Sequence, residues 1–133
     1  MSNLSDCVLV VDDEPFIAEL WCIHLRLMGL QICGIAATAD AAVTLAMQHR
    51  PSLILMDVRL RGRRDGVDAA LEINASLGSR IIVITGSREP ETIARINTAS
   101  PAAVLYKPVS DRQMHSAIRH ALSLGEGPVA GMA

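Results

Sequence analysis

Short apolar runs alternate with longer amphipathic segments along the whole chain. Five such runs recur at intervals of roughly 20 to 30 residues; they cover residues 7–11, 31–36, 53–56, 80–84 and 102–106. Several are almost continuously hydrophobic, which is typical of strands that are covered on both faces. The pattern therefore predicts five short, buried strands.

The segments between these runs have the period of an α-helix. In the clearest one, 110–124, apolar residues fall on one helical face. Ser110 and Gln113 form a capping-box pattern at its start, and Gly125 follows its end. The remaining segments carry start or stop residues of similar kinds, namely Gly29, Thr38, Gly78 and Pro90. We therefore predict a helix after each strand.

A strand followed by a helix, five times over, is typical of an α/β protein with a doubly wound parallel sheet. Right-handed crossovers place the helices over both faces of such a sheet. Ligands of open α/β sheets gather beyond the carboxyl ends of the strands. Functional residues of this chain are therefore expected at those ends.

Polar side chains follow four of the five predicted strands, namely Asp12 and Asp13, Asp57, Thr85, and Lys107. Three carboxylates in one cleft repel one another unless a cation joins them. Oxygen ligands without histidine or thiolate favour Mg²⁺, with Mn²⁺ as the alternative. The charges of three carboxylates, one divalent ion and the Lys107 ammonium cancel, which suits a phosphoryl group. Asp57, at the end of the central strand, is the best placed nucleophile.

Each of these residues has an ordinary explanation when taken alone. Asp13 could place a charge at the N-terminus of the first helix, and Thr85 could be a strand or capping residue. Lysine side chains such as Lys107 are usually solvated. Their combined placement at one sheet edge favours a functional site.

Composition narrows the range of partners. The chain has 133 residues, half of them hydrophobic, which is enough for one ordinary domain. It contains one Phe, one Trp and one Tyr, and its formal net charge is -2. Few aromatic rings and no overall basic charge make DNA an unexpected partner.

The first residues and the cysteines predict a cytoplasmic protein with no membrane segment. The opening MSNLSDCVLVVDDE lacks a basic region and reaches two acids after a short apolar run. Cys7, Cys22 and Cys33 lack the close paired spacing of a zinc or redox motif. We therefore interpret each cysteine as a small hydrophobic residue in a reducing compartment.

The joint pattern over about 7–124 resembles the receiver domains of two-component response regulators. The resemblance implies strand order 2-1-3-4-5 and a phosphoryl group accepted by Asp57 from a histidine kinase or phosphotransfer protein. It implies a metal site formed by the residues Asp13, Asp57, the backbone carbonyl of Arg59, and Asp12 through water. It further implies that Thr85 and Lys107 contact the phosphoryl oxygens and that Lys107-Pro108 is a cis peptide. Such a protein is a switch rather than a turnover enzyme.

Two regions depart from the family pattern. Most receivers have an aromatic residue three positions before the lysine, where this chain has Val104. Tyr106 lies on the same face of the strand and could either take part of that switching role or simply pack under the last helix. The loop VRLRGRRDG after Asp57 is rich in arginine. A solvated charged loop is the ordinary explanation, and the hypothesis to test against it is that the loop steers an acidic or phosphorylated partner.

We expect a receiver domain over 1–124 and a flexible tail over 125–133. Because only nine residues follow Leu124, we expect a single-domain regulator whose signal leaves through protein contacts, with an unknown downstream target. The expected output surface is the region of the last two helices, with Ile93 and Ile96 supplying apolar area. A homodimer is a further possibility.

Two other functions compete with this one. An aspartyl-phosphate phosphatase also has an acid nucleophile on an α/β sheet, but it needs a second aspartate where this chain has Arg59. A receiver-like binding module without phosphorylation is compatible with Val104. Nucleotide binding is disfavoured, since the first turn VVDDEPF has neither a glycine fingerprint nor a P-loop lysine.

Overall fold

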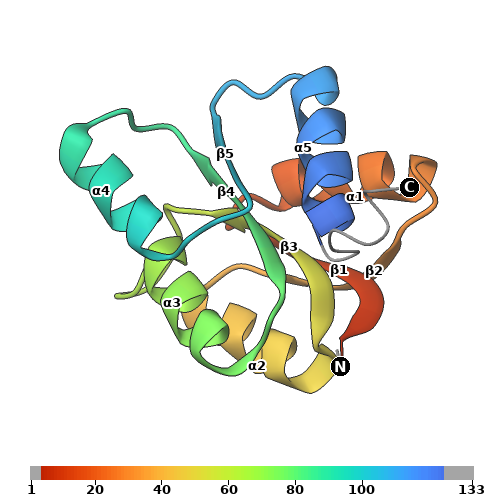
Figure 1. The fold of residues 1–133 in the computed structure, drawn as a ribbon, viewed down its shortest axis with the longest axis horizontal. Coiled ribbons are helices and arrows are strands. Elements are labelled where there is room, and N and C mark those ends of the chain that lie inside the picture. Colours follow the sequence, from red (N-terminus) through yellow and green to blue (C-terminus); the bar gives the residue numbers. More distant parts are fainter. Residues whose placement is uncertain (1–3, 125–133) are drawn as a thin grey trace.

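The computed structural model describes residues 4–124, which form a five-stranded parallel sheet with five helices (Figure 1). The elements in chain order are β1 (Ser5–Val11), α1 (Pro15–Leu27), β2 (Gln31–Ala36), α2 (Ala39–His49), β3 (Pro51–Asp57), α3 (Gly66–Ser76), β4 (Arg80–Thr85), α4 (Pro90–Thr98), β5 (Ala103–Tyr106) and α5 (Asp111–Leu124). The strand order is β2-β1-β3-β4-β5, which confirms the predicted fold class and topology. The predicted tail and the stop at Gly125 lie outside the described residues.

The sheet separates two hydrophobic cores. Helices α1 and α5 cover one face and α2, α3 and α4 cover the other (Figure 1). Alternate residues of β1 serve the two cores: Val8 and Val10 face α1 and α5, whereas Leu9 and Val11 face the opposite layer. Every one of these four side chains is buried. Covering on both faces explains why the strands are continuous apolar runs rather than alternating ones.

Local capping residues set several helix ends as the sequence predicts. The Thr38 hydroxyl accepts a hydrogen bond from the amide of Ala41 at 3.0 Å. Ser110 and Gln113 form the reciprocal pair of a capping box, at 2.9 and 3.1 Å. Gly29 follows α1 with a φ of 84°, a conformation that glycine adopts without steric cost.

The prediction that Cys7 and Cys33 are simple hydrophobic residues is wrong. The two form a disulfide between the neighbouring strands β1 and β2, with their Cα atoms 5.4 Å apart. The register between these strands shifts after the Val8–Ile32 pair, so that Leu9 pairs with Gly34. Sequence spacing does not specify that register, so it could not predict the bond. Cys22 is a buried free cysteine, as expected.

The prediction that Ile93 and Ile96 supply an apolar output surface on α4 is also wrong in part. Ile96 is fully buried in the core and Ile93 is partly buried against it. Within the described residues, most of the exposed large apolar side chains lie on α1 instead, namely Phe16, Leu20, Ile23 and Leu27. None of the helices in 4–124 combines the length and apolar character needed to cross a lipid bilayer.

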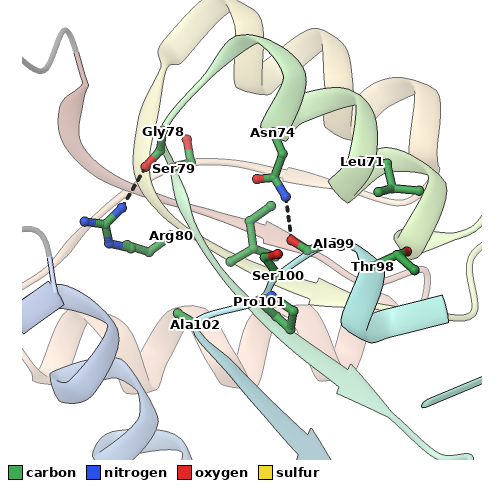
Figure 2. A pocket seen from close by; sticks show the side chains of 11 residues that line it. Leu71, Asn74, Gly78, Ser79, Arg80, Thr98, Ala99, Ser100, Pro101 and Ala102 are labelled. Atoms are coloured by element: carbon green, nitrogen blue, oxygen red, sulfur yellow. Dashed lines mark hydrogen bonds between the residues drawn. The ribbon is translucent and has the colours of Figure 1, made fainter. Parts of the chain in front are cut away.

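A shallow pocket lies at the start of β4, between the ends of α3 and α4 (Figure 2). Two of its polar side chains bind nearby backbone: Asn74 Nδ2 donates to the Ala99 carbonyl at 2.6 Å, and Arg80 Nη1 donates to the Gly78 carbonyl at 3.2 Å. Because Arg80 begins β4 and Thr85 ends it, this pocket lies at the opposite edge of the sheet from the predicted site.

Candidate functional site

Three carboxylates meet at the carboxyl ends of β1 and β3. Asp12 and Asp13 follow the last residue of β1, and Asp57 is the last residue of β3. Val11 pairs with Met56, so the parallel strands bring the acids to one edge. One oxygen from each acid lies within 4.8 Å of the others. Asp12 and Asp57 are each only 3% exposed, which makes their mutual repulsion costly.

Asp12 is held by two hydrogen bonds to neighbouring backbone, one to its side chain and one from its own amide. Its Oδ1 accepts a hydrogen bond from the amide of Glu14 at 2.9 Å, and its own amide donates to the Ala36 carbonyl at 3.0 Å. Glu14 is the N-cap of α1 but makes no side-chain capping bond. Burial raises the pKa of Asp12, although the Glu14 amide and Lys107 partly oppose this effect.

Asp57 forms an ion pair with Lys107 across the sheet edge. The Lys107 Nζ lies 3.0 Å from Asp57 Oδ1. Burial raises the pKa of Asp57 to about 6, despite the opposing effect of the Lys107 ammonium. Burial lowers the pKa of Lys107, but the contact with Asp57 outweighs this and the net shift is upward. The peptide bond between Lys107 and Pro108 is cis, the isomer that the family resemblance implies.

Thr85 ends β4 with its side chain buried. Its hydroxyl accepts from the Ser87 amide at 3.0 Å and donates to the Ser87 carbonyl at 3.3 Å. Its backbone carbonyl accepts from the amide of Lys107 at 2.9 Å. The hydroxyl therefore lies in a tight turn that joins the sheet edge to the loop before α4.

Gly66 is a site residue that sequence reasoning did not single out. A Cβ at Gly66 would lie 2.0 Å from the carbonyl oxygen of Asp57. The Gly66 amide donates to the Val58 carbonyl at 2.7 Å. The start of α3 thus packs directly on the backbone that carries Asp57, and only glycine fits there. The Asp65-Gly66 pair, an N-cap residue type followed by glycine, was the available signal in the sequence.

Arg95 connects α4 to the same helix start. Its guanidinium binds both carboxylate oxygens of Asp65 at 2.7 and 3.0 Å and reaches Asp68 at 3.2 Å. Asp65 also caps α3 by accepting from the amides of Val67 and Asp68. Burial alone would raise the pKa of Asp65, but the Arg95 hydrogen bond and the backbone amides lower it overall. This link between two helices has no local sequence signature.

Val104 and Tyr106 lie on one face of β5, as their spacing predicts. Val104 pairs with Val83 and packs into the core beneath α2, α3 and α4. Tyr106 pairs with Thr85 at the sheet edge. The guanidinium of Arg88 lies 4.1 Å from the centre of the Tyr106 ring, a cation–π contact to the loop before α4.

The arginine-rich loop is divided between structural and solvent-facing residues. Arg64 binds Asp40 on α2 at 2.9 Å and also Glu72 on α3. Arg61 and Arg63 are exposed, as is Arg59, which lies two residues beyond Asp57. Steering of a partner by this loop stays a prediction. The exposed arginines could contribute to it, whereas Arg64 is engaged with Asp40 and Glu72.

The donor set fits a hard divalent ion. The three clustered side chains offer only carboxylate oxygens as ligands. Burial raises the pKa of Asp12 and of Asp57, so it disfavours their charged forms. A bound cation would relieve this destabilisation. Carboxylate oxygens without nitrogen or sulfur ligands match the preference of Mg²⁺ or Mn²⁺.

The parallel sheet, with an acidic cluster and a lysine at the carboxyl ends of its strands, defines a doubly wound α/β domain of the receiver type. The family model "Response regulator receiver domain" matches residues 8–119. The chain therefore belongs to the response regulator receiver family.

Curated relatives support this assignment. The chain is 38% identical over 116 residues to the transcriptional regulatory protein PdtaR of Mycobacterium tuberculosis, covering 87% of this chain and 56% of PdtaR. It is 30% identical over 122 residues to the phyllosphere-induced regulator PhyR of Methylorubrum extorquens, covering 91% of this chain and 45% of PhyR. The chain thus spans about half the length of these relatives.

Solved structures agree with the fold. The signal receiver domain of a modulated diguanylate cyclase from Desulfovibrio desulfuricans has a TM-score of 0.83 at 33% identity, covering 90% of this chain and 94% of that one. A CheY-like receiver domain protein from Methanospirillum hungatei has a TM-score of 0.84 at 25% identity, covering 91% and 96%.

Proposed function

We propose that this receiver accepts a phosphoryl group on Asp57 from a phosphohistidine of a histidine kinase or phosphotransfer protein. The observation that carries the proposal is the buried Asp57 carboxylate, 3.0 Å from Lys107 and within reach of two further acids. A phosphate ester hydrolase is less compatible, because Arg59 stands where a second aspartate would supply the proton. The domain then works as a switch rather than as a turnover enzyme.

In the proposed transfer, an Asp57 oxygen attacks the phosphorus of the donor. A phosphorus–oxygen bond forms and the phosphorus–nitrogen bond breaks, and the departing nitrogen keeps the electron pair and is protonated. Asp57 must be ionised to attack, which its pKa of about 6 permits at neutral pH. Lys107 is placed to neutralise charge on the transferred group.

A divalent ion, Mg²⁺ or Mn²⁺, would be held by Asp13 and Asp57, with the Arg59 carbonyl as a further ligand and Asp12 acting through water. When bound, it supplies positive charge that offsets the carboxylates and the phosphoryl oxygens. The chain provides the hydrogen bonds that orient the acids, above all the Glu14 amide on Asp12.

Phosphorylation would be read through Thr85, whose hydroxyl gives up its bonds to Ser87 to donate to the phosphoryl group. The loop before α4 would then rearrange, together with Tyr106 and Val104. Such a change shifts the populations of two existing conformations rather than creating a new one. We propose that a downstream protein recognises the altered surface. We also propose a cytoplasmic location, which rests on the opening residues and not on the cysteines, because Cys7 and Cys33 form a disulfide.

Incubation with a small phosphodonor and Mg²⁺, followed by intact-mass measurement and peptide mapping, tests the proposal. We expect one labile phosphoryl adduct on Asp57, absent from Asp57→Asn and absent when a chelator removes the metal. Asp6→Asn is the matched control, since Asp6 is an exposed acid near the opposite end of β1.

Two outcomes would contradict the proposal. Repeated turnover of an ordinary phosphate ester would indicate a phosphatase. A chain that neither gains an adduct nor binds a divalent ion would instead be a receiver-like binding module.

A further inference from the structure

An exposed apolar stripe runs along α1 on the side that faces away from the sheet. Phe16 is 73% exposed, Leu20 45%, Ile23 47% and Leu27 82%. The opposite side of the helix, with Ala18, Cys22 and Leu25, is buried in the core. The fold itself therefore does not require four large apolar residues on the outer side.

The spacing of the stripe matches the contact positions of a coiled coil. Its residues are separated by four, three and four positions, as a and d residues are in a heptad. The pattern is also symmetric about the midpoint between Leu20 and Ile23. In an antiparallel pair of identical helices, Leu20 would therefore face Ile23 of the second copy, and Phe16 would face its Leu27.

Charges beside the stripe favour the same arrangement. Leu20 and Leu27 take the a positions of the heptad. Glu19 and Arg26 each lie one residue before an a residue, on one edge of the stripe, and both side chains are more than half exposed. In an antiparallel coiled coil, residues on this edge face one another across the interface. Glu19 of each copy would thus meet Arg26 of the other, which creates two intermolecular ion pairs. Within one copy the two groups are 3.7 Å apart, at the outer limit of an ion pair.

We propose that α1 is a self-association surface on which a second copy of this chain docks antiparallel, by a two-fold axis through the middle of the stripe. Such an interface is isologous, so each copy contributes the same residues. The proposal is independent of phosphorylation, because none of its contacts involves the acid cluster.

The size of the stripe indicates a weak and reversible dimer. A large apolar side chain carries roughly 150 to 200 Å² of surface, so the exposed fractions amount to about 400 Å² per copy. That equals the largest apolar patch of many monomers. It is about half of the 800 Å² that each partner contributes to a standard interface. We therefore expect association to depend on protein concentration.

Sedimentation velocity over a concentration series measures this equilibrium. We expect the wild type to shift from monomer to dimer, and Leu27→Glu to weaken association at least about tenfold. Leu71→Glu is the matched control, because Leu71 is an exposed leucine on α3, with 42% exposure. Circular dichroism of each variant checks that it is folded.

Charge reversal distinguishes the antiparallel dimer from general stickiness. Glu19→Arg alone and Arg26→Glu alone each place like charges in both intermolecular pairs, and each should weaken self-association about tenfold. Mixing the two variants restores opposite charges in both pairs, so the mixture should form a heterodimer. The proposal is overturned if the wild type stays monomeric at every concentration. It is also overturned if the mixture of the two variants associates no better than either variant alone. In either case the stripe would bind a different protein.

Discussion

Replacing Asp57 with asparagine should stabilise the metal-free protein at neutral pH, although it abolishes the proposed phosphoryl acceptance. Burial raises the pKa of Asp57 from 3.8 to about 6. Each pKa unit corresponds to about 1.4 kcal/mol, so ionisation of Asp57 costs the folded state about 3 kcal/mol. Asparagine has a similar shape and carries no charge, and it can still accept a hydrogen bond from Lys107.

The sign of the pH dependence follows from the direction of the shift. Because the folded state holds the Asp57 proton more tightly than the unfolded state, this group stabilises the fold below pH 3.8, and its contribution is lost as the pH rises through about 6. The stability of Asp57→Asn relative to the wild type should therefore be greatest above pH 7 and should vanish near pH 4.

Urea denaturation between pH 4 and pH 8 with a chelator present measures this difference. We expect Asp57→Asn to gain about 1 to 3 kcal/mol at pH 7.5, whereas Asp6→Asn changes little at any pH. Adding Mg²⁺ should narrow the gap, because a ligand that binds only the folded wild type stabilises it. A variant no more stable than the wild type at pH 7.5, or a gap independent of pH, would refute the reasoning.

Three further predictions concern the surroundings of Asp57 and the disulfide between β1 and β2. Gly66→Ala should lower the free energy of unfolding by more than about 2 kcal/mol, because the new Cβ would lie 2.0 Å from the Asp57 carbonyl oxygen. It should also slow phosphorylation, measured by mass in a time course. Gly78→Ala is the control and should have neither effect, since a Cβ at Gly78 has no neighbour within 4 Å. Lys107→Met should slow acceptance from a small phosphodonor by on the order of a hundredfold, since the charge beside Asp57 is lost; an unchanged rate would remove Lys107 from the mechanism. Reducing the Cys7–Cys33 disulfide, which spans 26 residues, should cost about 3 kcal/mol in urea denaturation, and Cys7→Ser should be insensitive to reductant.

Electrostatic steering by the loop after β3 is testable with Arg61 and Arg63, which are exposed and lie further from Asp57 in sequence than Arg59 does. Arg64 is bound to Asp40 and Glu72, so replacing it would disturb the packing of α2 and α3 as well as the charge. Arg61→Ser with Arg63→Ser should slow association with a phosphodonor protein in low salt and have little effect in high salt. Equal rates at low ionic strength would contradict steering.

Local patterns were enough to predict the architecture. Continuous apolar runs indicated buried parallel strands, and caps such as Thr38 and the Ser110–Gln113 pair indicated helix starts that the structure confirms. The acids, Thr85 and Lys107 were predicted together because the carboxyl ends of parallel strands share one edge. Each of these inferences needs only residue type and spacing within a short segment.

Features that depend on strand register or on contacts between distant segments were missed. The Cys7–Cys33 bond requires the irregular pairing of β1 with β2. Gly66 matters only because α3 begins against the Asp57 carbonyl, and Ile96 proved to be a core residue rather than part of a surface. Arg95 joins α4 to Asp65 over 30 residues of chain.

The amino-acid sequence by itself determined the order of the elements, the layering of the sheet and the chemical types of the side chains at its edge. This is because hydrophobic periodicity and helix capping depend only on residues that are close together in the sequence. Only the tertiary structure decided how deeply Asp57 is buried, which raises its pKa, and which helix leaves apolar residues exposed. Burial depends on what every other segment covers, and no single stretch of sequence contains that information.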